Sequence, residues 1–266
     1  MSVPYEEQAR QGLEELKLPV ALAQLDGAAQ RAAAEQWSYT HFLGYLLAGE
    51  LSERQRKRVE LNLQFAKFPY RKTLEEFEWS AQPSLDRRLV EELAGGRFLY
   101  EGRNIVLLGP PGVGKTHLAI GLGVMTAERG HRVYFSGVLD LAVKLTKAVD
   151  SNRLHRELKA LGQPKLLIID EVGYLALDRL QANLLFQVIC QRYQKGQSVV
   201  LTSNKAFSEW GSVFADDAVM ASAALDRLLH RSTIINIRGE SYRLKEKRKA
   251  GKGTQKDPSK GGDDMH

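Results

Sequence analysis

The sequence predicts an α/β protein, in which a five-stranded parallel sheet is covered by helices and preceded by a small all-α region. The 266-residue chain is 43% hydrophobic and 26% charged, which is the ordinary range of globular domains. Roughly the first 90 residues repeat apolar positions at spacings of three and four, the period of helices. Beyond Gly95 and Gly96, short apolar runs alternate with helical stretches, which is typical of an α/β fold.

The N-terminal region is expected to contain helices that begin at serine N-caps. Ser38 and Ser52 each precede a helical run, and Gly49 between them is suited to ending the first helix. Pro69 stops the helical pattern. A third serine-capped helix is expected over Ser84–Leu93.

Five apolar runs beyond Gly96 are expected to form the sheet. They are apolar throughout rather than alternating, so both of their faces should be buried, as in a parallel sheet. The strands are expected at Asn104–Leu108, Arg132–Phe135, Leu166–Asp170, Ser198–Thr202 and Thr233–Ile237.

These patterns divide the chain into four segments. From Lys245 onward there is almost no apolar content, which predicts a disordered basic tail. The expected segments are a helical N-terminal domain (1–68), a linker region (69–96), an α/β domain (97–244) and the tail (245–266).

Composition excludes several classes of protein. The chain begins with polar and acidic residues, and no window approaches the roughly 18 apolar residues of a membrane span. We therefore expect neither a secretory signal nor a membrane partner. Cys190 is the only cysteine, which excludes an intrachain disulfide and the usual cysteine-based zinc sites. A reducing, cytoplasmic location fits best.

Residues 109–116 match the full Walker A pattern, a phosphate-binding loop between a strand and a helix. Its glycines let backbone N–H groups converge on phosphates, and the helix N-terminus adds its positive end. We expect Lys115 to meet the β and γ phosphates of ATP and Thr116 to bind Mg²⁺. For His117, inside the helix, a structural role is favoured over a catalytic one. The expected nucleotide-binding residues are Gly109, Pro110, Pro111, Gly112, Val113, Gly114, Lys115, Thr116 and His117.

Two acids that end an apolar strand match a Walker B motif. Asp170 is expected to hold Mg²⁺ through a water molecule, and Glu171 to orient the attacking water as a general base. Such a pair alone is also compatible with a solvated turn. The next strand ends in Thr202-Ser203-Asn204, where a polar side chain could reach the same water or the γ phosphate. Asn204 is the residue expected to do so, although taken alone it is more often a turn former.

The combination of motifs favours an oligomeric ATPase of the AAA+ type. The sequence lacks the complete Asn-Lys-x-Asp motif that reads guanine, which argues against a GTPase. Arg227 follows a helical stretch, where an arginine of one subunit can complete the site of the next. The alternative for Arg227 is a surface pair with Asp226 or another acid.

Basic residues are concentrated between two of the expected strands. Residues 144–165 hold six basic and two acidic side chains, on what should be two helices broken near residues 150–152. This local surplus points to a polyanion, and we expect DNA contacts there; the alternative is a solvated helix face. A second cluster, residues 54–58, is equally compatible with phosphate contact and with a plain surface. The expected DNA-binding residues are Lys144, Lys147, Arg153 and Arg156.

These motifs together resemble the IstB family, ATP-binding helpers encoded beside the transposase of bacterial insertion sequences. The resemblance covers about residues 5–247, and its middle motifs are shared with DnaC-type helicase loaders. The matching strings are AKFP with KTLE, LLGPPGVGKTHLA, LLIIDEVGYLAL, TSNKAFSEWGSVF, ALDRLLHRS and GESYRLK.

The resemblance implies an AAA+ ATPase that uses ATP and Mg²⁺, forms a homo-oligomer on double-stranded DNA, selects or remodels the target and activates its partner transposase. Too few residues follow the last strand for the usual C-terminal lid, so no lid is expected, and Arg243 is a weak substitute for a lid arginine. Two other functions stay open. One is a DnaC-like replicative helicase loader, and the other is a nucleotide-gated DNA-binding protein that hydrolyses ATP too slowly for catalysis to matter.

Overall fold

The computed structural model describes residues 4–239 together with Ser241 and Tyr242. The chain divides into two compact units, residues 1–61 and 62–266. The expected tail and Arg243 lie outside the described residues.

The N-terminal unit is entirely helical, as expected. Its helices are α1 (Tyr5–Glu15), α2 (Pro19–Ala34) and the part of α3 (Tyr39–Ala66) that precedes residue 62. The Ser38 hydroxyl accepts a hydrogen bond from the His41 backbone N–H, which confirms this residue as the N-cap of α3.

The expected helix end at Gly49 is wrong, because α3 runs unbroken through Gly49 and Ser52. A Cβ at Gly49 would lie 2.7 Å from Oε1 of Gln24 on α2. The glycine therefore serves the close approach of two helices rather than a helix end.

A buried glutamate fixes the corner between α1 and α2. The Glu50 carboxylate, 4% exposed, accepts hydrogen bonds from the backbone N–H groups of Val20 and Ala21 in the first turn of α2. Arg54 pairs with Glu50 at 3.1 Å and also donates to the carbonyl of Lys17. One member of the second basic cluster is therefore engaged in holding this unit together.

The second unit is a five-stranded parallel sheet in the order β2-β3-β4-β1-β5. All five expected strands are confirmed, with ends that differ by two residues or fewer. The strands are β1 (Asn104–Leu108), β2 (Val133–Gly137), β3 (Leu166–Val172), β4 (Ser198–Ser203) and β5 (Ser232–Asn236).

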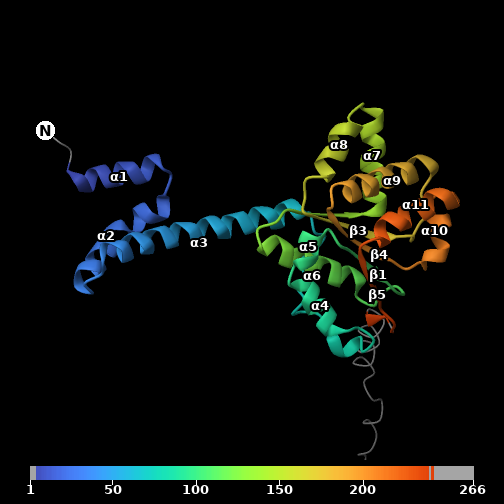
Figure 1. Cartoon of the computed structure of the whole chain (residues 1–266), viewed down its shortest axis with the longest axis horizontal. Helices are drawn as coiled ribbons and strands as arrows, with labels where there is room; N and C mark the ends of the chain where they lie inside the picture. Colours follow the sequence, from blue (N-terminus) through green and yellow to red (C-terminus); the bar gives the residue numbers. More distant parts are fainter. Residues whose placement is uncertain (1–3, 240, 243–266) are drawn as a thin grey trace, which may run out of the picture. The chain divides into compact units, whose positions relative to one another are not determined.

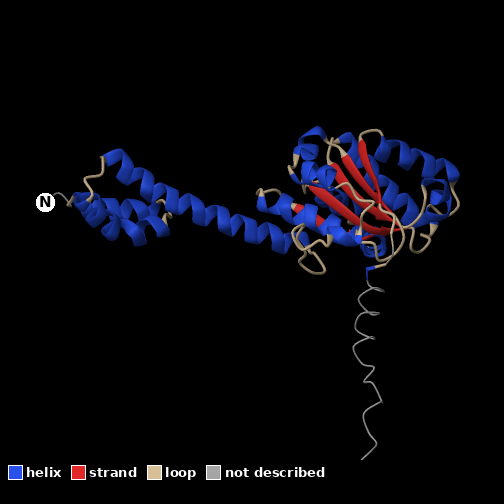
Figure 2. Cartoon of the chain, turned by 90° about the horizontal axis from the view of Figure 1, so that it is seen from below, coloured by secondary structure: helices blue, strands red, loops and turns tan. Residues whose placement is uncertain are grey.

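Helices cover both faces of the sheet (Figures 1 and 2). Alternate residues of β1, β2, β3 and β4 face two separate apolar cores, which explains why these strands are apolar over most of their length. One core contains α4 (Arg87–Ala94), α5 (Arg97–Glu101) and α6 (Lys115–Glu128). The other contains α7 (Val138–Asp150), α9 (Arg179–Gln194), α10 (Trp210–Val213) and α11 (Ala218–Leu229), with α8 (Leu154–Leu161) packed beside it. Two short 3₁₀ turns, η1 (Trp79–Ala81) and η2 (Phe207–Glu209), complete the unit.

The expected N-cap at Ser84 is wrong. Asp86 caps α4, accepting from the backbone N–H groups of Arg88 and Leu89. The Ser84 hydroxyl instead donates to the Arg238 carbonyl at 2.6 Å and accepts from its N–H at 2.9 Å. Ser84 thus ties the segment before the sheet to the segment after it.

A buried arginine links the segments at which β3 and β4 begin. The guanidinium of Arg192 on α9 is fully buried and donates to the carbonyls of Leu161 (2.9 Å), Pro164 (3.2 Å), Lys165 (3.2 Å) and Ser198 (2.7 Å). Among the described residues no carboxylate pairs with it. Arg192 therefore joins the end of α8 to the starts of β3 and β4 through carbonyls alone.

Candidate functional site

The phosphate-binding loop lies between the end of β1 and the start of α6, as the sequence predicts. Lys115 Nζ donates to the carbonyls of Gly109 (2.7 Å) and Pro110 (2.8 Å), so the loop curls around the ammonium group. Gly114 has φ +98°, and a Cβ there would lie 2.6 Å from the Phe77 ring. A glycine is required at this position because the backbone is left-handed and the linker packs directly on it.

Thr116 and Asp170 lie side by side next to this loop, near the C-terminal ends of the strands. The Thr116 hydroxyl lies 3.0 Å from both carboxylate oxygens of Asp170. Asp170 is 5% exposed, and no basic side chain of the described residues forms an ion pair with it. A buried, unpaired carboxylate beside a hydroxyl is the donor set that Mg²⁺ prefers, so these two residues fit the expected metal.

Glu171 is the most unusual backbone position of the site. Its φ is +62°, a left-handed value that non-glycine residues seldom adopt, and the register between β3 and β4 shifts between Ile169 and Val172. This bulge exposes the Glu171 side chain at the end of an otherwise buried strand. Backbone strain of this kind is concentrated at functional sites, and the catalytic role of Glu171 stays a prediction.

Of the three polar residues that end this stretch of the sequence, Thr202 rather than Asn204 contacts both acids. Thr202 Oγ1 on β4 lies 2.5 Å from Oδ1 of Asp170 and 3.0 Å from the backbone nitrogen of Glu171. The signal was a polar residue at the end of the apolar run that forms β4. Asn204, the residue predicted at this strand end, is exposed and makes no side-chain hydrogen bond within the described part of the chain.

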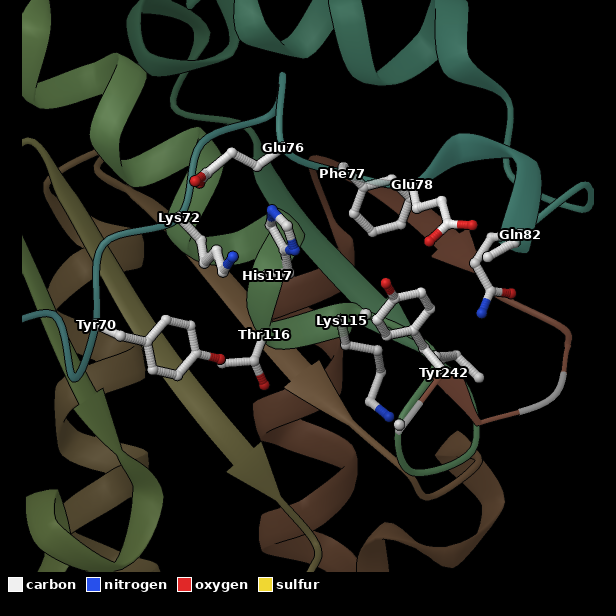
Figure 3. A pocket seen from close by; sticks show the side chains of 14 residues that line it. Tyr70, Lys72, Glu76, Phe77, Glu78, Gln82, Lys115, Thr116, His117 and Tyr242 are labelled. Atoms are coloured by element: carbon white, nitrogen blue, oxygen red, sulfur yellow. The ribbon is translucent and has the colours of Figure 1, made fainter. Parts of the chain in front are cut away.

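A cavity of about 470 Å³ opens beside the phosphate-binding loop (Figure 3). The linker supplies one wall and Tyr242 closes another, while the Tyr242 backbone N–H donates to the Gly112 carbonyl at 3.0 Å. His117 Nε2 lies 2.7 Å from the Thr73 carbonyl, which supports the structural role favoured for this histidine. The lining residues are Tyr70, Lys72, Glu76, Phe77, Glu78, Ala81, Gln82, Gly112, Val113, Gly114, Lys115, Thr116, His117 and Tyr242.

Arg227 lies at the opposite end of the strands, where β1 begins. It lines a hollow of about 310 Å³ together with Asn104, the first residue of β1, whereas the phosphate-binding loop follows the last residue of β1. Its guanidinium donates to the Ala223 carbonyl at 2.7 Å and stacks on Phe186 at 5.2 Å. The ion pair with Asp226 that the sequence left open does not form in the described structure. Arg227 is therefore not part of the nucleotide site of its own chain.

The predicted DNA-binding residues lie on α7 and α8 and around the turn between them. Lys147, Arg153 and Arg156 are exposed. Lys144 pairs with Glu157 at 3.0 Å and lies over the Tyr134 ring. Burial lowers the pKa of Lys144, but the hydrogen bonds and charge interactions with Glu157 and Tyr134 together outweigh burial, so the pKa is raised overall. The Lys144 ammonium group is therefore engaged by Glu157, whereas the side chains of Lys147, Arg153 and Arg156 are open to solvent.

The described residues offer neither a ready-made cluster of metal ligands nor a membrane-spanning helix. Residues 4–239, 241 and 242 contain no cluster of three His, Cys, Asp or Glu side chains suited to a metal ion. No helix of that part is long and apolar enough to cross a bilayer.

Comparison with solved structures supports the fold. AMPPCP-bound DnaA from Aquifex aeolicus superposes with a TM-score of 0.55 at 20% identity, covering 74% of this chain and 58% of that one. The structure of DnaI gives 0.54 at 20% identity, covering 63% of this chain and 91% of that one. At this level of identity the likeness concerns the fold alone, an AAA+ ATPase core.

Comparison of sequences identifies the family. The chain is 48% identical to an ATP-binding protein of insertion sequence IS21 from Pseudomonas aeruginosa, over 90% of this chain and 89% of that protein. It is 46% identical to the ATP-binding protein of insertion sequence IS5376 from Geobacillus stearothermophilus, over 88% and 92%. The family model described as IstB-like ATP binding protein matches residues 11–250. With its complete phosphate-binding loop and acid pair, the chain belongs to the IstB-like ATP-binding proteins and is an ATPase of the AAA+ fold.

Proposed function

We propose that this ATPase assembles into an oligomer on double-stranded DNA, and that the ATP-bound assembly selects or remodels target DNA and activates a partner transposase. The names of its relatives support an insertion-sequence role over a helicase loader. The proposal of an oligomer rests on the position of Arg227, which lies where β1 begins, whereas the phosphate-binding loop lies where β1 ends.

Each residue at and beside the phosphate-binding loop has a separate role in ATP hydrolysis. Lys115 leaves the carbonyls of its own loop and binds the β and γ phosphates. Thr116 and Asp170 hold Mg²⁺, which when bound neutralises charge on the phosphate oxygens. Glu171 accepts the proton of the water that attacks the γ phosphorus, while the bond from that phosphorus to the bridging oxygen breaks. Asn204, the residue that follows β4, contacts the same water or the departing phosphate.

A second copy of the chain completes this site. Negative charge on the transferred phosphoryl group requires a cation beyond Lys115, and Arg227 cannot reach it within one chain. A head-to-tail arrangement brings Arg227 of one copy to the nucleotide of the next. ATP hydrolysis then depends on assembly, as expected of a protein that acts only once it is assembled on DNA.

The exposed cations of α7 and α8 supply the DNA contact. Lys147, Arg153 and Arg156 come from two helices and from the turn between them, and none of them lines the nucleotide cavity. Contacts of this kind bind phosphates without reading bases, so affinity should be largely independent of sequence. Assembly multiplies the number of such surfaces facing one duplex, so ATP should strengthen binding.

A subunit-mixing experiment tests the composite site. Lys115→Ala and Arg227→Ala should each be inactive alone, but their mixture should recover ATPase activity because some interfaces hold one intact loop and one intact arginine. The matched control mixes Lys115→Ala with the Lys115→Ala/Arg227→Ala double variant, in which no loop is intact and no recovery is expected. Absence of recovery in confirmed mixed oligomers would contradict the composite site.

A salt titration tests the DNA surface. The variant Lys147→Ala/Arg153→Ala/Arg156→Ala should bind duplex DNA more weakly, and each lost phosphate contact should flatten the log-log salt slope by about 0.9. The control Arg71→Ala/Arg87→Ala/Arg97→Ala removes three exposed cations from other parts of the same unit. An unchanged slope in the first variant, or an equal change in the control, would refute the assignment.

A further inference from the structure

One hydroxyl group contacts both acids of the candidate catalytic site. Thr202 is 1% exposed, and its Oγ1 lies within hydrogen-bond distance of the Asp170 carboxylate and of the Glu171 backbone N–H. The chemistry of the partners fixes the direction of both bonds. A carboxylate only accepts and a backbone N–H only donates, so the hydroxyl donates its single proton to Asp170 and accepts from Glu171.

The local register explains why a side chain is needed there. Ile169 is paired with Leu201 and Val172 with Ser203, so that two residues of β3, Asp170 and Glu171, face Thr202 alone. This is a bulge, and it interrupts the strand ladder at the backbone of the acid pair. The Thr202 hydroxyl takes the place of the missing ladder partner for the Glu171 N–H.

We propose that Thr202 is a positioning residue for ATP hydrolysis, which holds Glu171 in its left-handed conformation and fixes the Asp170 carboxylate toward the metal site. The inference rests on the roles proposed above for the two acids. Thr202 acts through them and lines no part of the nucleotide cavity. Loss of its hydroxyl should therefore slow hydrolysis while leaving ATP binding nearly intact.

The chain offers a matched control in the next residue. Ser203 is fully buried on the same strand end, and its hydroxyl donates to the Val172 carbonyl at 2.7 Å. It contacts neither acid. A purely structural contribution of buried hydroxyls at this strand end would appear equally in both residues, whereas a positioning role belongs to Thr202 alone.

The experiment compares steady-state ATPase rates and nucleotide affinities of Thr202→Val, Thr202→Ser and Ser203→Ala. Thr202→Val keeps the shape and should lower kcat by about tenfold or more, since a small misplacement of a catalytic group costs up to about a hundredfold. Its affinity for a fluorescent ATP analogue should stay within about threefold of the wild type. Thr202→Ser retains the hydroxyl and should restore most of kcat, and Ser203→Ala should be near normal. Thr202→Ala gives the same comparison if Thr202→Val does not fold.

A double variant separates this inference from the proposed function. Adding Thr202→Val to Glu171→Gln should lower the residual kcat by a smaller factor than Thr202→Val lowers the wild-type kcat, because part of the effect of the hydroxyl is transmitted through Glu171. A wild-type rate in Thr202→Val beside an inactive Glu171→Gln would overturn the positioning role alone, as would equal losses in Thr202→Val and Ser203→Ala. A wild-type rate in Glu171→Gln would overturn the assignment of Glu171 itself, and the positioning role with it.

Discussion

Replacing Arg192 with lysine should destabilise the ATPase unit at least as much as replacing it with methionine, although lysine keeps the positive charge. The reason is the geometry of the four carbonyls around the guanidinium. One terminal nitrogen donates to Leu161 and Pro164, and the other donates to Lys165 and Ser198. A lysine ammonium presents its donors from a single atom, so it reaches only one of these two pairs.

The magnitude follows from the number of bonds lost. Hydrogen bonds that involve a charged group contribute about 1.5–3 kcal/mol each, so Arg192→Lys should lose about 3–6 kcal/mol by leaving two carbonyls without a donor. The charge stays buried without a carboxylate, and its desolvation cost is not recovered. Arg192→Met loses all four bonds but removes that cost, which offsets a large part of the loss. Against a typical total of about 5–15 kcal/mol, either change is severe.

Urea unfolding followed by the fluorescence of Trp210, which is buried in the same unit, measures both variants. Replacement of the other two tryptophans by phenylalanine in every protein compared isolates this signal. The matched control is Arg179→Lys, an exposed arginine at the start of the same helix, which should unfold like the wild type. An Arg192→Lys variant within about 0.5 kcal/mol of the wild type would show that charge, rather than the forked geometry, is what this position requires.

Three further outcomes are expected. Lys115→Ala should lose ATP binding, whereas Glu171→Gln should bind ATP and fail to hydrolyse it. Binding of a fluorescent nucleotide and release of phosphate measure the two effects. Equal binding defects in both variants would contradict the separate roles of the two residues. Tyr242→Ala should weaken ATP binding but leave competition by inorganic triphosphate unchanged, because its side chain lines the cavity beside the loop while its backbone N–H holds Gly112. Burial raises the pKa of the Cys190 thiol, so the thiolate fraction at pH 8 is smaller than that of free cysteine, and alkylation should be slower and should accelerate at higher pH. A rate equal to that of free cysteine at pH 8 would contradict that shift.

Local chemistry explains which parts of the fold were predictable. The strands could be located because continuous apolar runs require burial on both faces, and the phosphate-binding loop because its glycines, lysine and threonine have fixed spacing. The errors at Gly49 and Ser84 have one cause. Both residues have the local chemistry of a helix end, but each serves a contact distant in sequence, with Gln24 and with Arg238.

The candidate site was predictable only in part, for a related reason. Asp170 and Glu171 could be found because two acids end an apolar strand. The contact of Thr202 with both acids could not be predicted, because it depends on a register shift between two strands that the sequence of neither strand reveals. The position of Arg227 at the end where the strands begin likewise depends on how α11 leads into β5, which the sequence motif around Arg227 does not reveal.

The link between Ser84 and Arg238 has a consequence for the order in which the protein is made. These residues are 154 positions apart in the chain, yet together they hold the segment that brings Tyr242 onto the nucleotide cavity. On the ribosome, the phosphate-binding loop therefore emerges long before the last wall of its own pocket. A nascent chain that has not reached Tyr242 already contains the linker wall and the loop but lacks this last wall, so it should bind ATP more weakly than the finished chain.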